Sequence, residues 1–491
     1  MSDLRNYIAR SFITCVHCWH EFPLDQTLWI SESPENLGDI RLGESAQQRF
    51  LPTRFNAKGS AIDSNGFVCS KLACPRCHLM IPRSLIEMPP YFVSIVGAPA
   101  SGKSYFLASM IWKLRNTFPR EFGIAFSDAD PEMNLRLHNY ESIQFVNSES
   151  NRLVSIEKTE VYGSLYDTVL FNDQRISYPQ PFAFSIAPMS DHPNANESAK
   201  YSHLLCVYDN AGESYLPGAD AGTHPVTRHL SQSNCILFLY DPTQDHRFRA
   251  ACQGKSDDPQ LLDSIDGSTV NRSPMRQDTI LAEMVKRVRL HNGLATSERH
   301  KKPLYIIVTK LDAWSHLLDN TDWSDPWKRV RSRDPGNLIV KRSSDSLKTV
   351  PEVPQDDTSQ ASDFPNGLEN LFSITETKPE DPKKAEPESP AKPFRSSLAG
   401  FSTKRVEEVS AAVRTLLLKL APEIVITAEQ FAEKVKYIPI SATGRAPSID
   451  PLSGILGFRP KDISPIWTEV PILYALSQST RGIVPVLLPK K

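Results

Sequence analysis

Short apolar runs alternate with segments of helical periodicity along most of this chain. The runs have the length and the β-branched or aromatic content of buried strands, and they lie at Tyr91–Val96, Phe182–Ile186, Leu204–Tyr208, Ile236–Tyr240, Leu304–Val308 and Tyr437–Ile440. Apolar residues recur at helical spacing after the first run, and again at 279–291 and 404–420. This alternation predicts an α/β fold in which a parallel sheet is covered by helices on both faces, as a three-layer α/β/α sandwich.

Two changes in composition divide the chain of 491 residues. Residues 1–89 hold five of the eight cysteines and predict a separate small module. Residues 341–398 are rich in Pro, Ser, Asp, Glu and Lys and poor in large apolar side chains, so they predict a disordered insertion. Helical periodicity resumes after this insertion. We therefore expect one α/β domain in two parts, residues 90–340 and 399–491.

The cysteines of the first module form two C-x-x-C pairs, "CVHC" and "CPRC". Such pairs present thiolates to one tetrahedral ion, so Cys15, Cys18, Cys74 and Cys77 predict a structural zinc site of the zinc-ribbon type. The pairs are much further apart than the roughly 15–20 residues of compact ribbons, so the segment between them must form an elaborated loop or subdomain. A disulfide pair and a redox C-x-x-C are the alternatives. Substitute ligands would come from Cys69, His17, His20 or His78.

The segment "GAPASGKS" follows the first predicted strand and fits the pattern G-x-x-x-x-G-K-[ST] of a P-loop, or Walker A, motif. Its glycines would let the backbone N–H groups turn inward at a helix N-terminus, where phosphate is favoured. Lys103 would reach the terminal phosphates, and the Ser104 hydroxyl would bind Mg²⁺. The phosphate-binding residues expected here are Gly97, Ala100, Ser101, Gly102, Lys103, Ser104 and Tyr105. The alternative is a Gly/Ser/Pro turn with a surface lysine.

Three more short motifs lie at predicted strand ends. Asp209 and Gly212, in "LLCVYDNAGE", have D-x-x-G spacing, which could hold Mg²⁺ through water and sense a γ-phosphate. An Asx turn that ends a strand is the alternative for this motif. The other two motifs are Thr309-Lys310-Leu311-Asp312, in "LYIIVTKLD", and Ser441-Ala442, in "VKYIPISATG".

Taken together, these motifs resemble those of P-loop GTPases, in the order in which that family carries them. The resemblance covers residue 91 to about residue 480, and it implies GTP or GDP with Mg²⁺ as ligands. It further implies that the carboxylate of Asp312 accepts hydrogen bonds from guanine N1 and N2, that Lys310 lies over the base, and that the N–H of Ala442 meets the guanine oxygen. Thr309 departs from the commoner asparagine. Zinc knuckles joined to an elaborated GTPase also resemble the double-GTPases of bacterial conflict (defence) systems.

The resemblance leaves the catalytic details open. A switch threonine that covers Mg²⁺ should lie in the large insertion around residues 122–180, and Thr159 is the first candidate and Thr168 the second. Glu213 takes the place of the glutamine that orients the attacking water in Ras-like proteins. Together with Lys103 it is our candidate catalytic residue. A carboxylate there lacks the amide donor, so we expect slow hydrolysis that needs a group from a partner or a second protomer.

The net charge of −2 gives no overall argument for nucleic acid or an anionic membrane as a partner. No apolar run approaches the ~18 residues of a spanning helix, and the first residues lack the apolar core of a secretory signal, so we expect a cytoplasmic protein. The main hypothesis is a GTPase switch with a protein effector or activating partner, including a homo- or heterodimer with another GTPase. The alternative is a GTP-binding scaffold that scarcely hydrolyses and docks protein or nucleic acid through its zinc module. An ATPase or nucleotide kinase would leave the Thr309–Asp312 motif unexplained.

Overall fold

The computed structural model describes residues 10–156, 166–172, 174–209, 227–256, 258–261, 276–318, 321–329, 338–339, 398–450, 456–480 and 482–487. Ten α-helices occur among these residues, together with one sheet of seven strands and several small sheets. In the described part of the chain no helix is long and apolar enough to cross a membrane.

The large sheet has the strand order β10-β13-β14-β9-β15-β16-β20. Its strands are β9 (Pro90–Gly97), β10 (Ile124–Asp128), β13 (Phe182–Pro188), β14 (His203–Asp209), β15 (Cys235–Tyr240), β16 (Leu304–Val308) and β20 (Val435–Pro439). The five strands β14, β9, β15, β16 and β20 run parallel. All six predicted strands are present in this sheet, and β10 is an addition at its edge.

The expectation of an all-parallel sheet is wrong, because β13 pairs antiparallel with both β10 and β14. The connection from β13 to β14 carries a 3₁₀ turn (Ala195–Glu197) and, as its one α-helix, the four-residue α3 (Ser198–Tyr201). A helix of that length rises about 6 Å, whereas a strand of seven residues spans about 23 Å. The connection therefore does not carry the chain back along the sheet in a helical crossover, and β14 returns beside β13 in the opposite direction.

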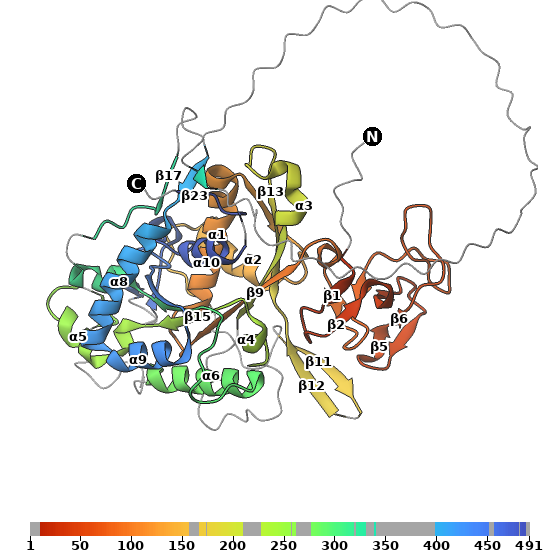
Figure 1. The fold of residues 1–491 in the computed structure, drawn as a ribbon, viewed down its shortest axis with the longest axis horizontal. Helices are drawn as coiled ribbons and strands as arrows, with labels where there is room; N and C mark the ends of the chain where they lie inside the picture. The colour runs from red at the N-terminus through yellow and green to blue at the C-terminus, as the bar shows by residue number, and fades with distance from the viewer. Residues whose placement is uncertain are drawn as a thin grey trace, which may run out of the picture. The chain divides into compact units, whose positions relative to one another are not determined.

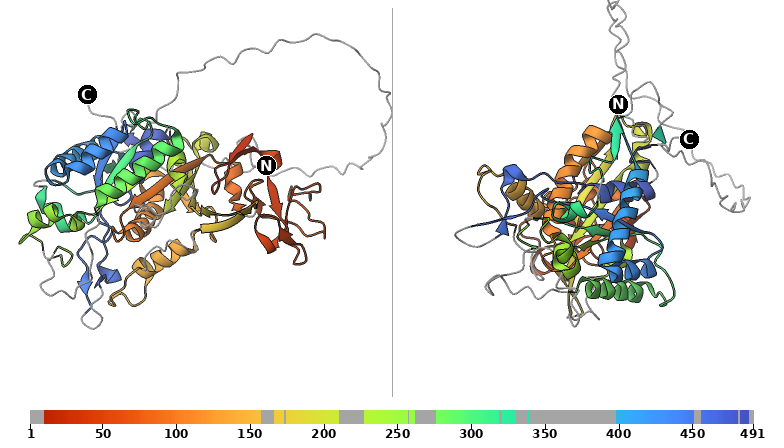
Figure 2. Two further views of the ribbon diagram at one scale, coloured as in Figure 1. Left: turned by 90° about the horizontal axis from the view of Figure 1, so that it is seen from below. Right: turned by 90° about the vertical axis from the view of Figure 1, so that its left-hand side faces the viewer.

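Helices cover both faces of this sheet (Figure 1, Figure 2). Helix α1 (Lys103–Thr117) follows β9, and α10 (Val470–Ser479) packs on the same sheet through a hydrogen bond from Ser479 to the hydroxyl of Tyr91, 2.7 Å long. The remaining helices are α2 (Leu135–Glu141), α4 (His229–Gln232), α5 (His246–Cys252), α6 (Gln277–Asn292), α7 (Leu311–Trp314), α8 (Thr403–Leu420) and α9 (Pro422–Phe431). The two helices predicted from periodicity at 279–291 and 404–420 are α6 and α8.

The N-terminal residues form small antiparallel sheets. Their strands are β1 (Phe12–Thr14), β2 (Glu21–Pro23), β3 (Leu28–Ile30), β4 (Leu37–Asp39), β5 (Gly43–Gln47), β6 (Arg49–Phe50), β7 (Leu72–Ala73) and β8 (Met80–Ile81). Further small sheets use β11 (Tyr166–Phe171), β12 (Gln174–Pro179), β17 (Trp327–Arg329), β18 (Leu338–Ile339), β19 (Ala399–Phe401), β21 (Ser448–Ile449), β22 (Leu456–Gly457) and β23 (Val486–Leu487). The first cysteine pair lies in the turn between β1 and β2, and the second lies in the turn between β7 and β8, which belong to a different small sheet.

The N-terminal module shares a hydrophobic core with the large sheet. Trp19, Phe22 and Leu79 of the module lie in one buried cluster with Phe92 of β9 and Tyr208 of β14. Alternate residues of β14 face this cluster, while the residues between them face a second and larger core. The change in composition near residue 89 thus marks a change in sequence but not a gap in packing.

A buried ion pair ties α1 to α10. The ammonium of Lys113 lies 3.1 Å from a carboxylate oxygen of Glu469, whose side chain is fully buried. Burial raises the pKa of Glu469, and the nearby charge of Lys113 opposes that rise. Because one partner is inaccessible to water, loss of the other leaves an uncompensated charge.

We predict that Lys113→Met lowers the free energy of unfolding at pH 7 by up to about 3 kcal/mol. The raised pKa of Glu469 means that the folded protein binds a proton more tightly than the unfolded chain does. The defect should therefore shrink as the pH falls below neutrality and Glu469 becomes neutral. Urea unfolding at pH 7 and pH 5 measures it. Lys113→Met with Glu469→Gln should recover most of the loss, and equal stabilities for the single and double variants would contradict the account.

Candidate functional site

Five parallel strands end along one edge of the sheet, and the residues that follow them come from distant parts of the sequence. Gly97 ends β9 and lies opposite Leu239 of β15, and Asp209 ends β14 beside Ile95. Val308, the last residue of β16, lies between Tyr240 and Pro439 of the neighbouring strands. Ligands of open α/β sheets bind outside these carboxyl ends, where the strand order reverses. Here that reversal occurs at β9, with β14 on one side and β15 on the other.

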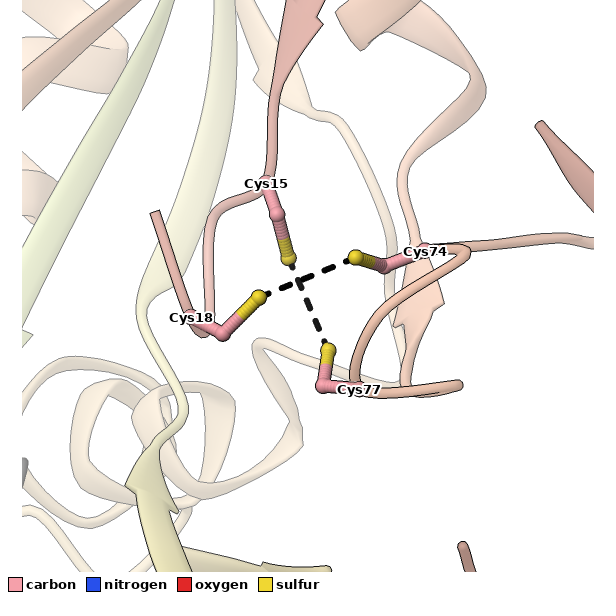
Figure 3. A group of neighbouring side chains, drawn as sticks. All are labelled: Cys15, Cys18, Cys74 and Cys77. Carbon is pink, nitrogen blue, oxygen red and sulfur yellow. Dashed lines mark hydrogen bonds between the residues drawn. The ribbon is translucent and has the colours of Figure 1, made fainter. Parts of the chain in front are cut away.

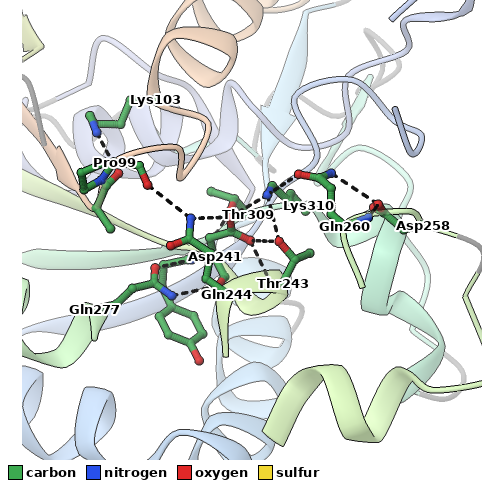
Figure 4. Close-up of polar contacts among 12 residues, drawn as sticks. Pro99, Lys103, Asp241, Thr243, Gln244, Asp258, Gln260, Gln277, Thr309 and Lys310 are labelled. Carbon is green, nitrogen blue, oxygen red and sulfur yellow. Dashed lines mark hydrogen bonds and ion pairs between the residues drawn. The ribbon is translucent and has the colours of Figure 1, made fainter. Parts of the chain in front are cut away.

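The loop from Gly97 to Gly102 is tight. Its backbone adopts conformations and close contacts that most residues with a side chain cannot adopt. A Cβ atom on Gly97 would lie 2.9 Å from the backbone oxygen of Leu239 and 2.8 Å from Oγ of Ser101. Gly102 has a φ of 87° and Ala100 a φ of 60°, both in the left-handed region. Lys103 begins α1 and donates to the backbone oxygens of Gly97 and Ala98, each at 3.0 Å, so its ammonium lies inside the loop (Figure 4).

The loop places a cation and a helix N-terminus together. Helix α1 has 15 residues, so its first N–H groups carry the partial positive charge of a long helix. Oγ of Ser101 is buried and has no hydrogen-bond partner among the described residues. This arrangement can attract an anion and offer it backbone donors.

The two residues after the lysine differ in surroundings. Ser104 is the second residue of α1 and is partly exposed. The hydroxyl of Tyr105 accepts a hydrogen bond from the N–H of Ile156 at 2.9 Å, its ring lies 5.4 Å from that of Phe458, and burial raises its pKa. The side chain of Tyr105 therefore joins the start of α1 to Ile156 and Phe458.

Lys310 is held by three side chains at the end of β16. Its φ is 55°, and its ammonium donates to Oδ2 of Asp241 at 2.6 Å, Oγ1 of Thr243 at 2.9 Å and Oε1 of Gln260 at 2.8 Å (Figure 4). All three N–H donors of the ammonium are used, so its position is fixed. A further residue, Gln244, links this network to the loop after β9 by donating to Oδ2 of Asp241 at 3.0 Å and to the backbone oxygen of Pro99 at 3.3 Å.

Asp312 and Ser441 meet although they are 129 residues apart in sequence. Ser441 Oγ donates to Oδ1 of Asp312 and accepts from the N–H of Gly444 at 2.7 Å. The other carboxylate oxygen, Oδ2, remains able to accept hydrogen bonds from a ligand. Burial raises the pKa of Asp312, and the hydrogen bond from Ser441 opposes that rise.

The neighbouring motif residues are held by the scaffold. The N–H and hydroxyl of Thr309 both donate to the backbone oxygen of Tyr240, at 2.9 and 3.2 Å, so this side chain ties β16 to β15. The backbone oxygen of Ala442 accepts from Oγ of Ser109 in α1 at 2.6 Å. The loop that begins at Ser441 is thereby fixed against the helix that begins at Lys103.

Sequence reasoning missed several residues of this site. Asp241, Thr243 and Gln260 position Lys310, yet nothing in their local sequence marks them. Asp258 is 1% exposed, and its Oδ2 has no hydrogen-bond partner within the described residues. Burial raises the pKa of Asp258, and the charge of Asp241 adds to that rise. The loop from 258 to 261 therefore adds a second buried carboxyl group near Lys310.

Some expected site residues have no described position. Gly212, Glu213 and Thr159 lie outside the described residues. Asp209 is buried at the end of β14. Thr168 lies in β11, where its hydroxyl is 3.4 Å from that of Ser177.

The four predicted zinc ligands come together in a buried group (Figure 3). The sulfur atoms of Cys15 and Cys77 are 3.7 Å apart, as are those of Cys18 and Cys74, and all four lie within 4.8 Å of one another. A tetrahedral ion with metal–sulfur bonds of ~2.3 Å requires sulfur atoms about 3.8 Å apart. A disulfide needs about 2.05 Å. This cluster could therefore hold a metal ion.

The two cysteine pairs have the same local structure, which explains how they converge. The N–H of His17 points to the sulfur of Cys15 at 3.3 Å, and the N–H of Arg76 points to the sulfur of Cys74 at 3.4 Å. The residue after each pair, Trp19 or His78, has a positive φ. Such turns direct backbone N–H groups at the sulfurs, which favours thiolates.

The proposed substitute ligands lie elsewhere. The sulfur of Cys69 faces the backbone oxygen of Phe67 at 3.6 Å, and the ring of His20 stacks on that of Phe22. His17 Nε2 bonds the backbone oxygen of Met80, and His78 Nδ1 lies 2.8 Å from Asp39. Among the residues that the structure describes, the group that could hold a metal ion therefore consists of the four cysteines.

Comparison with known proteins found no family model that matches this chain. It found no curated protein that matches either.

We predict that enlarging residue 97 destabilises the protein in proportion to size. Gly97→Ala should lower the free energy of unfolding by about 1–3 kcal/mol, because its Cβ would press on backbone and on Ser101. Gly97→Val should lower it further. Strand propensity alone would make Gly97→Val more stable than Gly97→Ala, since valine is favoured in strands. Urea unfolding decides between the two, and a Gly97→Val protein as stable as wild type would refute the steric account.

Proposed function

We propose that this chain is a GTP-binding protein that hydrolyses GTP slowly and acts as a nucleotide-dependent switch. The observation that carries the proposal is the hydrogen bond between Ser441 and Asp312 at the edge of the sheet that also bears the Gly97–Gly102 loop. Two motifs that are separate in sequence thus form one acceptor site for a base, beside a loop suited to phosphates. The strand order supports the same proposal, because the reversal point lies at that loop.

The base site favours guanine on chemical grounds. Guanine presents two adjacent N–H groups, which a carboxylate can accept together, whereas adenine presents a different pattern of donors and acceptors. In this proposal Asp312 accepts from guanine, Ser441 orients Asp312, and the stem of Lys310 covers the base. The N–H of Ala442 would meet the guanine oxygen.

The phosphate site follows from the loop. Lys103 would exchange its contacts with the Gly97 and Ala98 carbonyls for phosphate oxygens, and the N–H groups from Ala100 to Tyr105 would surround the phosphates. Ser104 and Asp209 would hold Mg²⁺, directly or through water, with Thr159 proposed as the switch residue. The ion would neutralise charge that develops on the phosphates during hydrolysis.

Slow turnover and a partner are part of the proposal. Glu213 is offered as the residue that orients water, and its negative charge would disfavour attack on an anionic γ-phosphate. Acceleration would then require a group from a second protein or protomer. A scaffold that binds GTP without turnover is the second candidate, and single-turnover hydrolysis by the purified protein separates the two. A role within a bacterial conflict system is proposed from the arrangement of motifs alone.

We also propose zinc as the metal of the four-cysteine group, because four thiolates and tetrahedral spacing match a closed structural zinc site. Such a site adds its binding free energy to folding. Zinc would therefore be tightly bound and would have no open position for catalysis.

For the base site, the expected result is that GTP binds far more tightly than ATP in titrations of the full chain. Asp312→Asn should reverse the preference from guanine to xanthine nucleotide, since an amide can donate to the oxygen of xanthine. Asp278→Asn, which removes an exposed ion pair with Arg276, is the matched control and should leave GTP binding unchanged. Equal GTP and ATP affinities in the wild type would overturn the proposed function.

Guanine preference should also depend on pH. The carboxyl of Asp312 must be ionised to accept two hydrogen bonds, and burial raises its pKa. Acidification should therefore reduce the ratio of GTP to ATP affinity at a higher pH than the ordinary aspartate value of about 3.9 would give. Protonation of the triphosphate affects the affinities for GTP and ATP alike, so it does not change their ratio. A ratio that stays constant to pH 4.5, in protein shown to remain folded, would argue against Asp312 as the acceptor.

For the metal, we predict one zinc per chain in wild type and in Cys69→Ser, and a loss of zinc in Cys15→Ser. Cys69 is an apt control because it is equally buried but lies outside the four-cysteine group. Elemental analysis of protein purified without chelators gives the count. Wild-type protein without zinc would remove the assignment.

A further inference from the structure

One buried hydroxyl joins the four-cysteine group to the edge of the sheet. Tyr208 is fully buried and directly precedes Asp209 in β14. Its hydroxyl donates to the backbone oxygen of Val16 at 2.5 Å and accepts from Nε1 of Trp19 at 3.1 Å. Both partners belong to the turn of the first cysteine pair.

That turn has its shape because of the cysteines. Val16 lies between the two thiols of the pair, and Trp19 follows the second with a φ of 53° and an N–H that donates to the backbone oxygen of Cys15 at 3.1 Å. A metal ion bound to both sulfurs would hold this turn fixed. The position of the Tyr208 hydroxyl therefore follows the position of the cysteine pair.

The contact continues to the strand that bears the phosphate loop. The ring of His229 stacks on that of Tyr208, with centroids 5.0 Å apart, and its Nδ1 is 2.5 Å from Oγ of Ser94. Ser94 lies in β9, three residues before Gly97. Burial lowers the pKa of His229 to about 3, so the ring is neutral and its packing does not change near neutral pH.

Adjacent residues of a strand point to opposite faces, so Tyr208 and Asp209 move together through one peptide unit. A displacement of the tyrosine on the module side changes the direction of the aspartate on the ligand side. The interaction is strong enough to matter, because loss of the hydroxyl would leave two buried polar groups without a partner, at a cost of about 1–3 kcal/mol each.

We propose that Tyr208 is a positioning residue for Asp209, and that metal binding at the four cysteines and magnesium–nucleotide binding at the strand ends thereby strengthen each other. The proposal rests on the proposed function, since Asp209 acts there through Mg²⁺. By thermodynamic linkage the coupling is reciprocal: whatever factor zinc adds to the affinity for nucleotide, nucleotide adds to the affinity for zinc. In this proposal the N-terminal module contributes to nucleotide binding through Tyr208.

The test compares Tyr208→Phe with wild type in the full chain. The dissociation constant of GDP is measured in excess Mg²⁺ and in buffer freed of divalent ions by resin, with zinc counted in each sample. The gain in affinity that Mg²⁺ provides should fall at least about fivefold in Tyr208→Phe, the lower end of typical coupling factors. Affinity without Mg²⁺ should change little, because in the proposed site Asp209 acts on the nucleotide through Mg²⁺.

Tyr91→Phe is the matched control. Tyr91 is also a buried strand tyrosine, and its hydroxyl accepts a hydrogen bond from Ser479, but it lies at the opposite end of its strand. It should keep the wild-type gain from Mg²⁺. Trp19→Phe removes only the indole donor, so its gain in affinity from Mg²⁺ should lie between those of wild type and Tyr208→Phe. It replaces Tyr208→Phe in the test if that variant folds poorly.

A second measurement tests the reciprocal direction. Release of zinc to a chromogenic chelator should be slower in the presence of magnesium and GDP in wild type and in Tyr91→Phe, and this protection should be lost in Tyr208→Phe. Equal losses of affinity with and without Mg²⁺, or undiminished protection in Tyr208→Phe, would overturn the coupling while leaving nucleotide binding intact. Wild-type protein that binds no guanine nucleotide would instead overturn both proposals.

Discussion

The common edge at which five parallel strands end is the constraint on which the rest of this structure depends. It brings the loop after β9, Asp209, Asp241, Lys310 and Ser441 together from more than 340 residues of sequence. Because these residues follow buried strands, their backbones are fixed by the ladder of hydrogen bonds rather than by contacts among themselves. Their side chains are then not needed to fix the backbone and can contact a ligand. The left-handed backbones of Ala100, Gly102 and Lys310 lie at this edge, where strained conformations commonly serve binding.

A second feature is the way the small N-terminal module is built into the sheet. Its core continues into β9 and β14, and the turn of its first cysteine pair contacts Tyr208 through Val16 and Trp19. A metal ion at the four cysteines would add its binding free energy to the folding of this module. The consequence is that β14 links the four-cysteine group to the candidate ligand site, since Tyr208 contacts the turn of the first cysteine pair and Asp209 ends the strand. The turn of the first cysteine pair is thus in contact with the residue that directly precedes Asp209.

Much of this architecture could be predicted from the sequence. The apolar runs located six of the seven strands, and the two C-x-x-C pairs identified the four cysteines that cluster. The direction of β13 could not be predicted, since it depends on a short connection whose path the apolar pattern does not encode. Asp241, Gln260 and Asp258 were missed because they act through contacts across loops, with no motif of their own. The role of Tyr208 could not be predicted, because an apolar run does not reveal that one hydroxyl within it has a partner in another module.

The central claim is that the strand-end site holds a guanine nucleotide. The most direct measurement is to purify the full chain gently, denature it, and identify the released nucleotide by chromatography, with zinc counted in the same sample. The account predicts GDP or GTP together with one zinc per chain. Release of an adenine nucleotide, or protein that stays free of guanine nucleotide even after incubation with GTP and Mg²⁺, would contradict it.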